Sequence, residues 1–187
     1  DLFVYMDTVQ LTNSSSFNFV TRNYIKSSQG PQLLTVPIKK KGFMNKELKE
    51  LEIDYSQNWV KKHLRTIETN YRKSNNYSYF FPKLKKIYDM EINHFTDFCY
   101  EQLIFFLKEM DIKTKIIKLS EISTKHNKSD LILEICMHFK AKQYIAGGKS
   151  MEYLNVNKFL ENKIEIIMQN FKNPLYKQLH GSFIENM

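Results

Sequence analysis

Two polar side chains directly follow the first apolar segment of the chain. Residues 2–6 form a short apolar run rich in β-forming side chains, and Asp7 and Gln10 come just after it. In an open parallel sheet, ligands bind beyond the carboxyl ends of the strands. At such a place, Asp7 can orient a substrate hydroxyl, hold a metal through water or act as a general base, and Gln10 can orient an acceptor. We therefore predict Asp7 as a catalytic residue and Gln10 as a substrate-binding residue.

Basic and amide side chains accompany the next two strand-like segments. Arg22 and Asn23 lie within one of them, and Lys39 follows the other. Arginine offers a bidentate fork for phosphate or carboxylate, and asparagine can lock that fork or read a hydroxyl. We predict that all three residues bind substrate, with Arg22 and Lys39 on its phosphate. The alternative for Arg22 and Asn23 is a role in strand pairing.

An aromatic residue and a histidine lie one helical turn apart in the middle of the chain. Trp59 and His63 are followed by Ile67 and Tyr71 at the same four-residue spacing. Histidine is the side chain best suited to move protons near neutral pH. We predict His63 as the catalytic base and Trp59 as a substrate-binding residue. The alternative is a packing stripe in which His63 is a satisfied core residue.

A glycine pair precedes a lysine near the end of the chain, in Gly147-Gly148-Lys149-Ser150. A phosphate-binding P-loop needs another glycine five residues before the final Gly-Lys pair, and that position is Gln143. The segment is therefore either a plain turn from strand to helix or an atypical anion-binding turn. On the second interpretation Gly147, Gly148 and Lys149 bind substrate, and we expect them to converge with Asp7.

The elements expected to position these residues alternate between strands and helices. Expected strands are residues 2–6, 17–26, 32–38, 48–55, 115–119, 144–145 and 164–168; expected helices are 57–73 with Ser56 as N-cap, 82–90, 93–110, 129–139 and 156–160, and 75–82 is an aromatic loop. Such alternation requires right-handed crossovers and a mainly parallel sheet. The predicted fold class is α/β, a Rossmann-like sheet with flanking helices in one domain, 1–187, with residues 17–55 as an inserted β-hairpin lobe.

Composition excludes several classes of protein. The 187 residues suffice for one domain with a real core, and they carry 28 Lys and Arg against 20 Asp and Glu, a net charge of +8. The lysines are spread through every segment, whereas nucleic-acid binders usually cluster basic residues on one face. The charge therefore suits an anionic small ligand, such as a nucleotide-sugar, and no nucleic-acid partner is predicted.

The two cysteines indicate neither a metal site nor a disulfide framework. Cys99 and Cys136 lie far apart, without a second cysteine or a histidine at ligand spacing. Free thiols of this kind favour a reducing cytoplasm. No run approaches the roughly 18 apolar residues of a membrane span. We predict a cytoplasmic protein with no metal ligands and no membrane span.

Several segments, taken in order, resemble the WbqC-like family of bacterial proteins. They are residues 1–10, Thr21-Arg22-Asn23-Tyr24-Ile25, residues 33–40, Trp59-Val60-Lys61-Lys62-His63, and Tyr144 to Gly147 with Tyr153-Leu154. Family members usually begin earlier and continue further, so the resemblance implies a chain truncated at both ends. It also implies that Tyr153, like the glycine turn, belongs to a substrate site.

The resemblance implies a role in O-antigen and other surface-polysaccharide biosynthesis. The start of the family is also similar in layout to pantothenate-synthetase-like nucleotidyltransferases, which join an activated carboxylate to an amine. Together these imply transfer of a small acyl or aminoacyl group to a nucleotide-linked amino sugar, with ATP or acyl-CoA as the candidate cofactor and other polysaccharide-biosynthesis enzymes as partners.

Two other functions compete with this interpretation. No nucleophile elbow, HExxH or paired-acid motif marks an enzyme, which favours a non-catalytic protein that binds a nucleotide-sugar for a partner enzyme. Nucleic-acid binding through the lysines is the third reading, and it requires a steep loss of affinity with salt.

Overall fold

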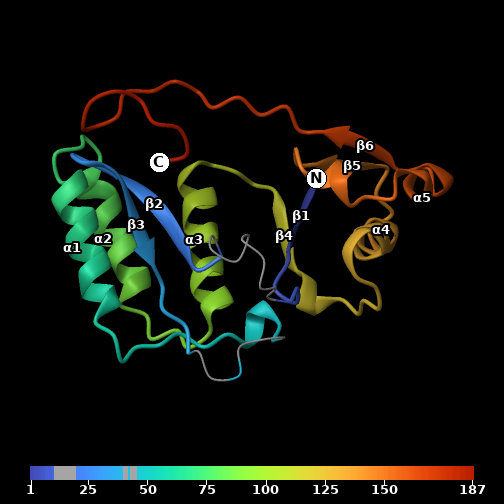
Figure 1. The fold of residues 1–187 in the computed structure, drawn as a ribbon, viewed down its shortest axis with the longest axis horizontal. Coiled ribbons are helices and arrows are strands. Elements are labelled where there is room, and N and C mark those ends of the chain that lie inside the picture. The colour runs from blue at the N-terminus through green and yellow to red at the C-terminus, as the bar shows by residue number, and fades with distance from the viewer. Residues whose placement is uncertain (11–19, 40–41, 43–45) are drawn as a thin grey trace. The chain divides into compact units, whose positions relative to one another are not determined.

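The computed structural model describes residues 1–10, 20–39, 42 and 46–187 (Figure 1). The chain forms two compact units: unit 1 consists of Asp1–Glu121 and Leu175–Met187, and unit 2 consists of Ile122–Pro174. Both contain helices with a short parallel pair of strands, so the fold is of the α/β class. The single domain with an inserted lobe stays a prediction beside this division.

Two strands near opposite ends of the first stretch of unit 1 pair in parallel. β1 (Leu2–Tyr5) pairs with β4 (Lys115–Lys118), with Phe3 opposite Ile116. Parallel strands need a long crossover connection, and here it carries the hairpin and three helices. The expected strands 2–6 and 115–119 are confirmed.

The predicted hairpin is present in unit 1. β2 (Arg22–Ser27) and β3 (Gly30–Thr35) pair antiparallel, with Ser27 opposite Gly30. Gly30 has a φ of +100°, in the left-handed region that glycine tolerates best. The hydroxyl of Ser27 donates to the Gly30 carbonyl at 2.8 Å, which fixes the turn. The first expected strand began at residue 17, and residues 17–19 lie outside the described part of the chain.

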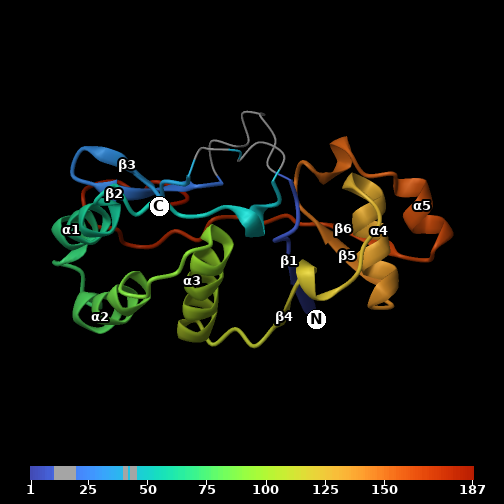
Figure 2. The same cartoon turned by 90° about the horizontal axis from the view of Figure 1, so that it is seen from below.

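Three helices complete the core of unit 1. They are α1 (Trp59–Tyr71), α2 (Tyr77–Tyr88) and α3 (Phe95–Glu109). α1 lies beside the hairpin and α2, and α2 lies beside α3 (Figure 2). Their apolar faces meet in a core of Leu51, Ile53, Trp59, Ile87, Tyr88, Phe95 and Phe98.

The strand expected at residues 48–55 is wrong. Leu48–Glu50 is a short 3-10 helix, and the residues after it make only isolated bridges. The backbone here bonds to several separate segments: Lys49 N–H donates to the Asp7 carbonyl at 2.8 Å, and Ile53 N–H to the Asn93 carbonyl at 2.8 Å. A strand needs one continuous partner. The apolar alternation instead reflects burial of Leu51 and Ile53 in the core.

The aromatic loop expected at residues 75–82 is also wrong, because α2 begins at Tyr77 and contains Pro82. Proline usually starts a helix or interrupts one, which is why a helix was expected only from residue 82. Contacts between the aromatic rings along the helix offset this preference. Tyr77 and Phe81, one turn apart, stack with ring centroids 4.7 Å apart.

Ser56 does not cap α1 as expected. Its hydroxyl donates to Asp54 Oδ1 at 2.6 Å, and the N-cap residue is Asn58. The acidic neighbour two residues earlier is the stronger local acceptor, so the serine closes a turn before the helix instead.

Unit 2 is a compact alternation of helices and strands. α4 (Lys128–His138) and α5 (Val156–Glu161) accompany the parallel strands β5 (Gln143–Ala146) and β6 (Glu165–Met168). Ala146 and Phe159 are fully buried in its core. The expected elements are confirmed, with ends shifted by one or two residues. Across the described residues of both units, no helix has the length and apolar character to cross a membrane.

Candidate functional site

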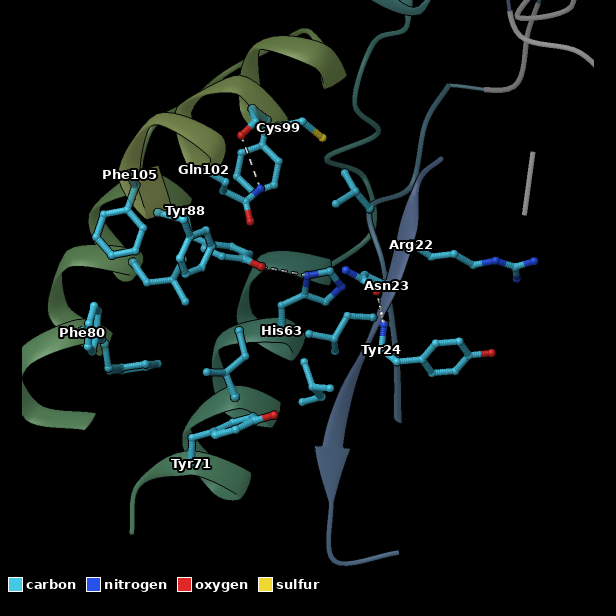
Figure 3. Close-up of a pocket in the computed structure, with 18 of the residues that line it drawn as sticks. Arg22, Asn23, Tyr24, His63, Tyr71, Phe80, Tyr88, Cys99, Gln102 and Phe105 are labelled. Atoms are coloured by element: carbon cyan, nitrogen blue, oxygen red, sulfur yellow. Dashed lines mark hydrogen bonds between the residues drawn. The ribbon is translucent and has the colours of Figure 1, made fainter. Parts of the chain in front are cut away.

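A cavity of about 690 Å³ lies within unit 1, among β2, α1, α2 and α3. Its volume is in the range typical of small-molecule sites. The wall is rich in aromatic side chains, contributed by Tyr24, Tyr71, Tyr77, Phe80, Phe81, Tyr88, Phe95, Phe98, Phe105 and Phe106. This cavity is the candidate functional site (Figure 3).

Helical spacing explains how the sequence builds this wall. Residues four apart share one face of a helix. On α1 that face carries His63, Ile67 and Tyr71. These are three of the four residues of the predicted stripe, and the fourth, Trp59, does not line the cavity. On α2 the same spacing brings Leu84 and Tyr88 to the cavity.

His63 is the most constrained polar group at the cavity. It is 4% exposed, and its Nε2 lies 3.0 Å from the carbonyl oxygen of Thr35. Since a carbonyl only accepts, Nε2 carries the proton and donates it. Nδ1 lies 3.3 Å from the hydroxyl of Tyr88. Burial lowers the pKa of His63, so the ring is neutral at neutral pH.

Trp59 lies in the core beside the cavity and is 4% exposed. Its ring contacts His63 edge-on at 5.1 Å between centroids and Phe98 at 5.4 Å. Its buried Nε1 has no hydrogen-bond partner among the residues that the structure describes. The predicted Trp59–His63 pair is thus brought together, but as a packed pair rather than an open surface.

Asp7 lies away from the cavity, buried at 3% exposure. Its Oδ1 accepts from the backbone N–H of Ser120 at 2.9 Å, and its Oδ2 accepts from the Ser120 hydroxyl at 2.5 Å. Both oxygens therefore hold the turn that follows β4. The catalytic role of Asp7 stays a prediction, and the geometry gives it a structural task.

The other predicted residues of unit 1 are dispersed. Gln10 is exposed and forms an isolated bridge with Glu47. Lys39 is exposed and ion-paired with Glu52 at 2.6 Å, and this hydrogen bond raises the pKa of Lys39. Neither lines the cavity.

Arg22 and Asn23 both line the cavity from β2. Figure 3 shows the side chain of Arg22 directed away from the helices, on the side of the strand opposite His63. The Asn23 side chain accepts from the N–H of Tyr24 at 2.8 Å. Of the predicted substrate-binding residues, these two line the cavity together with His63.

The glycine turn belongs to unit 2. Gly147, Gly148 and Lys149 are exposed, and Tyr153 is half exposed. Neither glycine has a φ in the left-handed region, and a Cβ on Gly148 would meet nothing within 4 Å. The turn itself does not require glycine. Its predicted convergence with Asp7 stays a prediction.

Sequence reasoning missed several polar groups of the cavity wall, among them Tyr88, Cys99 and Gln102. Burial raises the pKa of the Tyr88 hydroxyl and of the Cys99 thiol to about 12 each, so both are protonated at neutral pH. Gln102 Nε2 donates to the carbonyl of Phe98 at 3.3 Å. The available signal was their position on the apolar faces of α2 and α3. In the described chain, no cluster of three or more His, Cys, Asp and Glu side chains could hold a metal.

Comparison with known proteins identifies the family. The sequence model of the WbqC-like protein family matches residues 1–187. The chain belongs to the WbqC-like protein family. A relative of this WbqC-like chain is the uncharacterized protein Rv1507c of Mycobacterium tuberculosis (strain ATCC 25618 / H37Rv), 28% identical over 185 residues, which are 98% of this chain and 78% of the relative. No solved structure gives a significant match.

Proposed function

We propose that this WbqC-like protein acts in surface-polysaccharide biosynthesis by transferring an acyl or aminoacyl group to a nucleotide-linked amino sugar. The observation that carries the proposal is the aromatic cavity of unit 1, which suits the apolar part of an acyl group. In that reaction the sugar nitrogen attacks the thioester carbonyl of an acyl-CoA. The C–N bond forms, the C–S bond breaks, and the thiolate leaves with the proton that the amine gives up.

The charge of the cavity wall supports an acyl group rather than a phosphate. Among the described lining residues there is no Asp, Glu or Lys, and the Arg22 side chain is directed away from the helices (Figure 3). A phosphate needs several donors or cations, whereas a neutral aromatic wall stabilises apolar surface. The nucleotide part of the substrate would lie outside the cavity.

The proposal includes a Rossmann-like, nucleotidyltransferase-like architecture and a cytoplasmic location. The parallel pairs β1–β4 and β5–β6, each with helices between its strands, support the first. The free thiols of Cys99 and Cys136 support the second. The glycine turn and Lys149 are proposed to contact phosphate, with ATP as the alternative activating cofactor.

A second candidate function is binding of the sugar intermediate without catalysis. The observation that favours it is that His63 and Asp7 already spend their hydrogen bonds inside the protein. This protein would then present its ligand to another enzyme of polysaccharide biosynthesis.

Thermal unfolding of the full-length protein tests both functions, because a ligand that binds only the folded state raises the melting temperature. We expect stabilisation by acyl-CoA compounds, and amide formation when an amino-sugar nucleotide is added. Gln102→Trp fills the cavity and should abolish the stabilisation, whereas Lys108→Trp, at an exposed position of α3, should retain it. Stabilisation by the amino-sugar nucleotide without amide formation would establish the binding function, and no stabilisation by either an acyl-CoA or an amino-sugar nucleotide would overturn both.

A further inference from the structure

We propose that the Tyr88 hydroxyl oxygen selects the ligand by accepting a hydrogen bond from a neutral O–H or N–H donor on its apolar part. The inference rests on the proposed function only in that the cavity must hold a ligand. It assigns Tyr88 a contact with that ligand and makes His63 the residue that positions it.

The direction of the hydrogen bonds follows from one fixed acceptor. The Thr35 carbonyl cannot donate, so His63 Nε2 must, at 3.0 Å. A neutral imidazole has one donor and one acceptor nitrogen. Nδ1 is then the acceptor, and the only proton of the Tyr88 hydroxyl points to it at 3.3 Å.

What remains on Tyr88 is an acceptor at the cavity. A hydroxyl has one proton and two lone pairs, and the proton is already committed to His63. No other hydrogen bond to this hydroxyl occurs within the described part of the chain. The ring is packed edge-on against Phe98, 5.3 Å between centroids, and is tilted against Trp59 at 5.9 Å. The acceptor is therefore held in place.

The charge of the cavity wall determines which donor groups can bind to the Tyr88 oxygen. The described lining residues include no Asp or Glu side chain, so a bound ammonium group would lose its water without gaining a counter-charge from one. A hydroxyl or an amide N–H loses far less. The geometry therefore favours a hydroxyacyl group or an N-acylated aminoacyl group over a free aminoacyl group.

Other polar groups of the wall are less suited to this task. The Tyr71 hydroxyl accepts from the backbone N–H of Lys26 at 3.0 Å. Gln102 holds its own helix through Nε2, and its amide oxygen is the main rival acceptor. A variant at Gln102 therefore serves as the matched control.

The test compares indole and benzofuran, which have the same shape and differ in one N–H group. Binding to the full-length protein is measured by calorimetry for the wild type, Tyr88→Phe and Gln102→Leu. We expect the wild type to prefer indole about tenfold, the effect of one neutral hydrogen bond. Tyr88→Phe, which keeps the ring packing, should bind both equally, and Gln102→Leu should keep the preference.

Each other outcome contradicts a specific claim. Equal binding by the wild type, or a preference that survives Tyr88→Phe, would overturn the role of Tyr88 while leaving the cavity as a binding site. A preference lost only in Gln102→Leu would assign the acceptor to Gln102 and overturn the inference. If neither compound binds while acyl-CoA compounds still raise the melting temperature, the inference fails and the proposed function stands.

Discussion

The two residues predicted to be catalytic, Asp7 and His63, are both buried and hydrogen-bonded within the protein. Asp7 is a buried carboxylate, and an unpaired buried charge is costly. Two hydrogen bonds from Ser120 satisfy it and tie the end of β1 to the turn after β4. His63 likewise joins α1 to β3 and α2. The hydrogen bonds of both residues therefore account for a structural role, whether or not either residue also takes part in catalysis.

Replacing Asp7 by Asn tests this account. The amide offers one acceptor oxygen in place of two, so one Ser120 donor loses its partner, and we expect the free energy of unfolding to fall by about 1–3 kcal/mol. Urea denaturation measures the change. Asp111→Asn, at an exposed carboxylate, should change it by less than about 0.5 kcal/mol. Full stability with lost transfer activity would instead support the catalytic prediction.

The buried neutral state of His63 predicts a pH dependence of stability. Burial lowers its pKa in the folded state, while the unfolded chain keeps a pKa of about 6.5. Below that pH the unfolded state binds a proton that the folded state does not. Stability is therefore complete above about pH 6.5 and is lost as pH falls, by up to about 1.4 kcal/mol per pH unit.

Urea denaturation between pH 7.5 and 5.5 measures this slope. His63→Gln should give a flatter profile than the wild type, and comparison of the two removes the contribution of all other histidines. Parallel profiles would show that His63 is not the neutral, buried group described above.

At the scale of elements, the periodic spacing of apolar residues predicts helices and strands well. The backbone partners of a segment cannot be predicted in this way. The four-residue stripe of α1 and the apolar strand β1 are local patterns, so the sequence predicts them well. The segment after Leu48 alternates like a strand because Leu51 and Ile53 are buried, but its backbone partners lie in three distant segments. Such partners leave no local signal.

At the candidate site, too, local spacing could be predicted from the sequence and long-range contacts could not. The sequence predicts that Trp59 and His63 share a helix face, and the structure confirms this. The partners of His63 are Thr35, 28 residues earlier, and Tyr88, 25 residues later. No spacing rule connects them, since only the packing of β3, α1 and α2 brings them together.

Pro82 in α2 offers a test at the scale of one element. It lacks the N–H that would bond to the Ser78 carbonyl within the helix, and proline is about 3 kcal/mol less favourable than alanine in a helix interior. We expect Pro82→Ala to stabilise the protein by about 1–3 kcal/mol in urea denaturation. Lys86→Ala, exposed on the same helix, should have an effect within about 0.5 kcal/mol. Destabilisation by Pro82→Ala would mean that the proline shapes the packing of α2.

At the scale of the molecule, unit 1 is built from two separate stretches of chain. Residues Leu175–Met187 belong to it, and Lys26 is the anchor. The Lys26 side chain is 3% exposed, and its ammonium group donates to Gln178 Oε1 at 3.0 Å and to the Ser182 carbonyl. His180 Nε2 donates to the Asn70 carbonyl at 2.8 Å beside it.

Lys26→Met tests this anchor. Methionine keeps the apolar stem and removes the ammonium group, so Gln178 and Ser182 lose a charged donor. We expect the backbone amides of residues 178–184 to exchange hydrogen faster, and the free energy of unfolding to fall by about 1–3 kcal/mol. Lys177→Met, exposed on the same segment, is the control. Unchanged exchange in Lys26→Met would show that other contacts hold the segment.

The anchor also sets an order for folding during synthesis. Lys26 leaves the ribosome 152 residues before Gln178, and at about 5–20 residues per second this delay is about 8–30 s. Through that interval its ammonium group must stay hydrated, so the surroundings of β2 cannot close over it. Unit 2 is one continuous stretch, Ile122–Pro174, and needs no later residue of unit 1 for its core. The unit that begins first along the chain is therefore the one that is finished last.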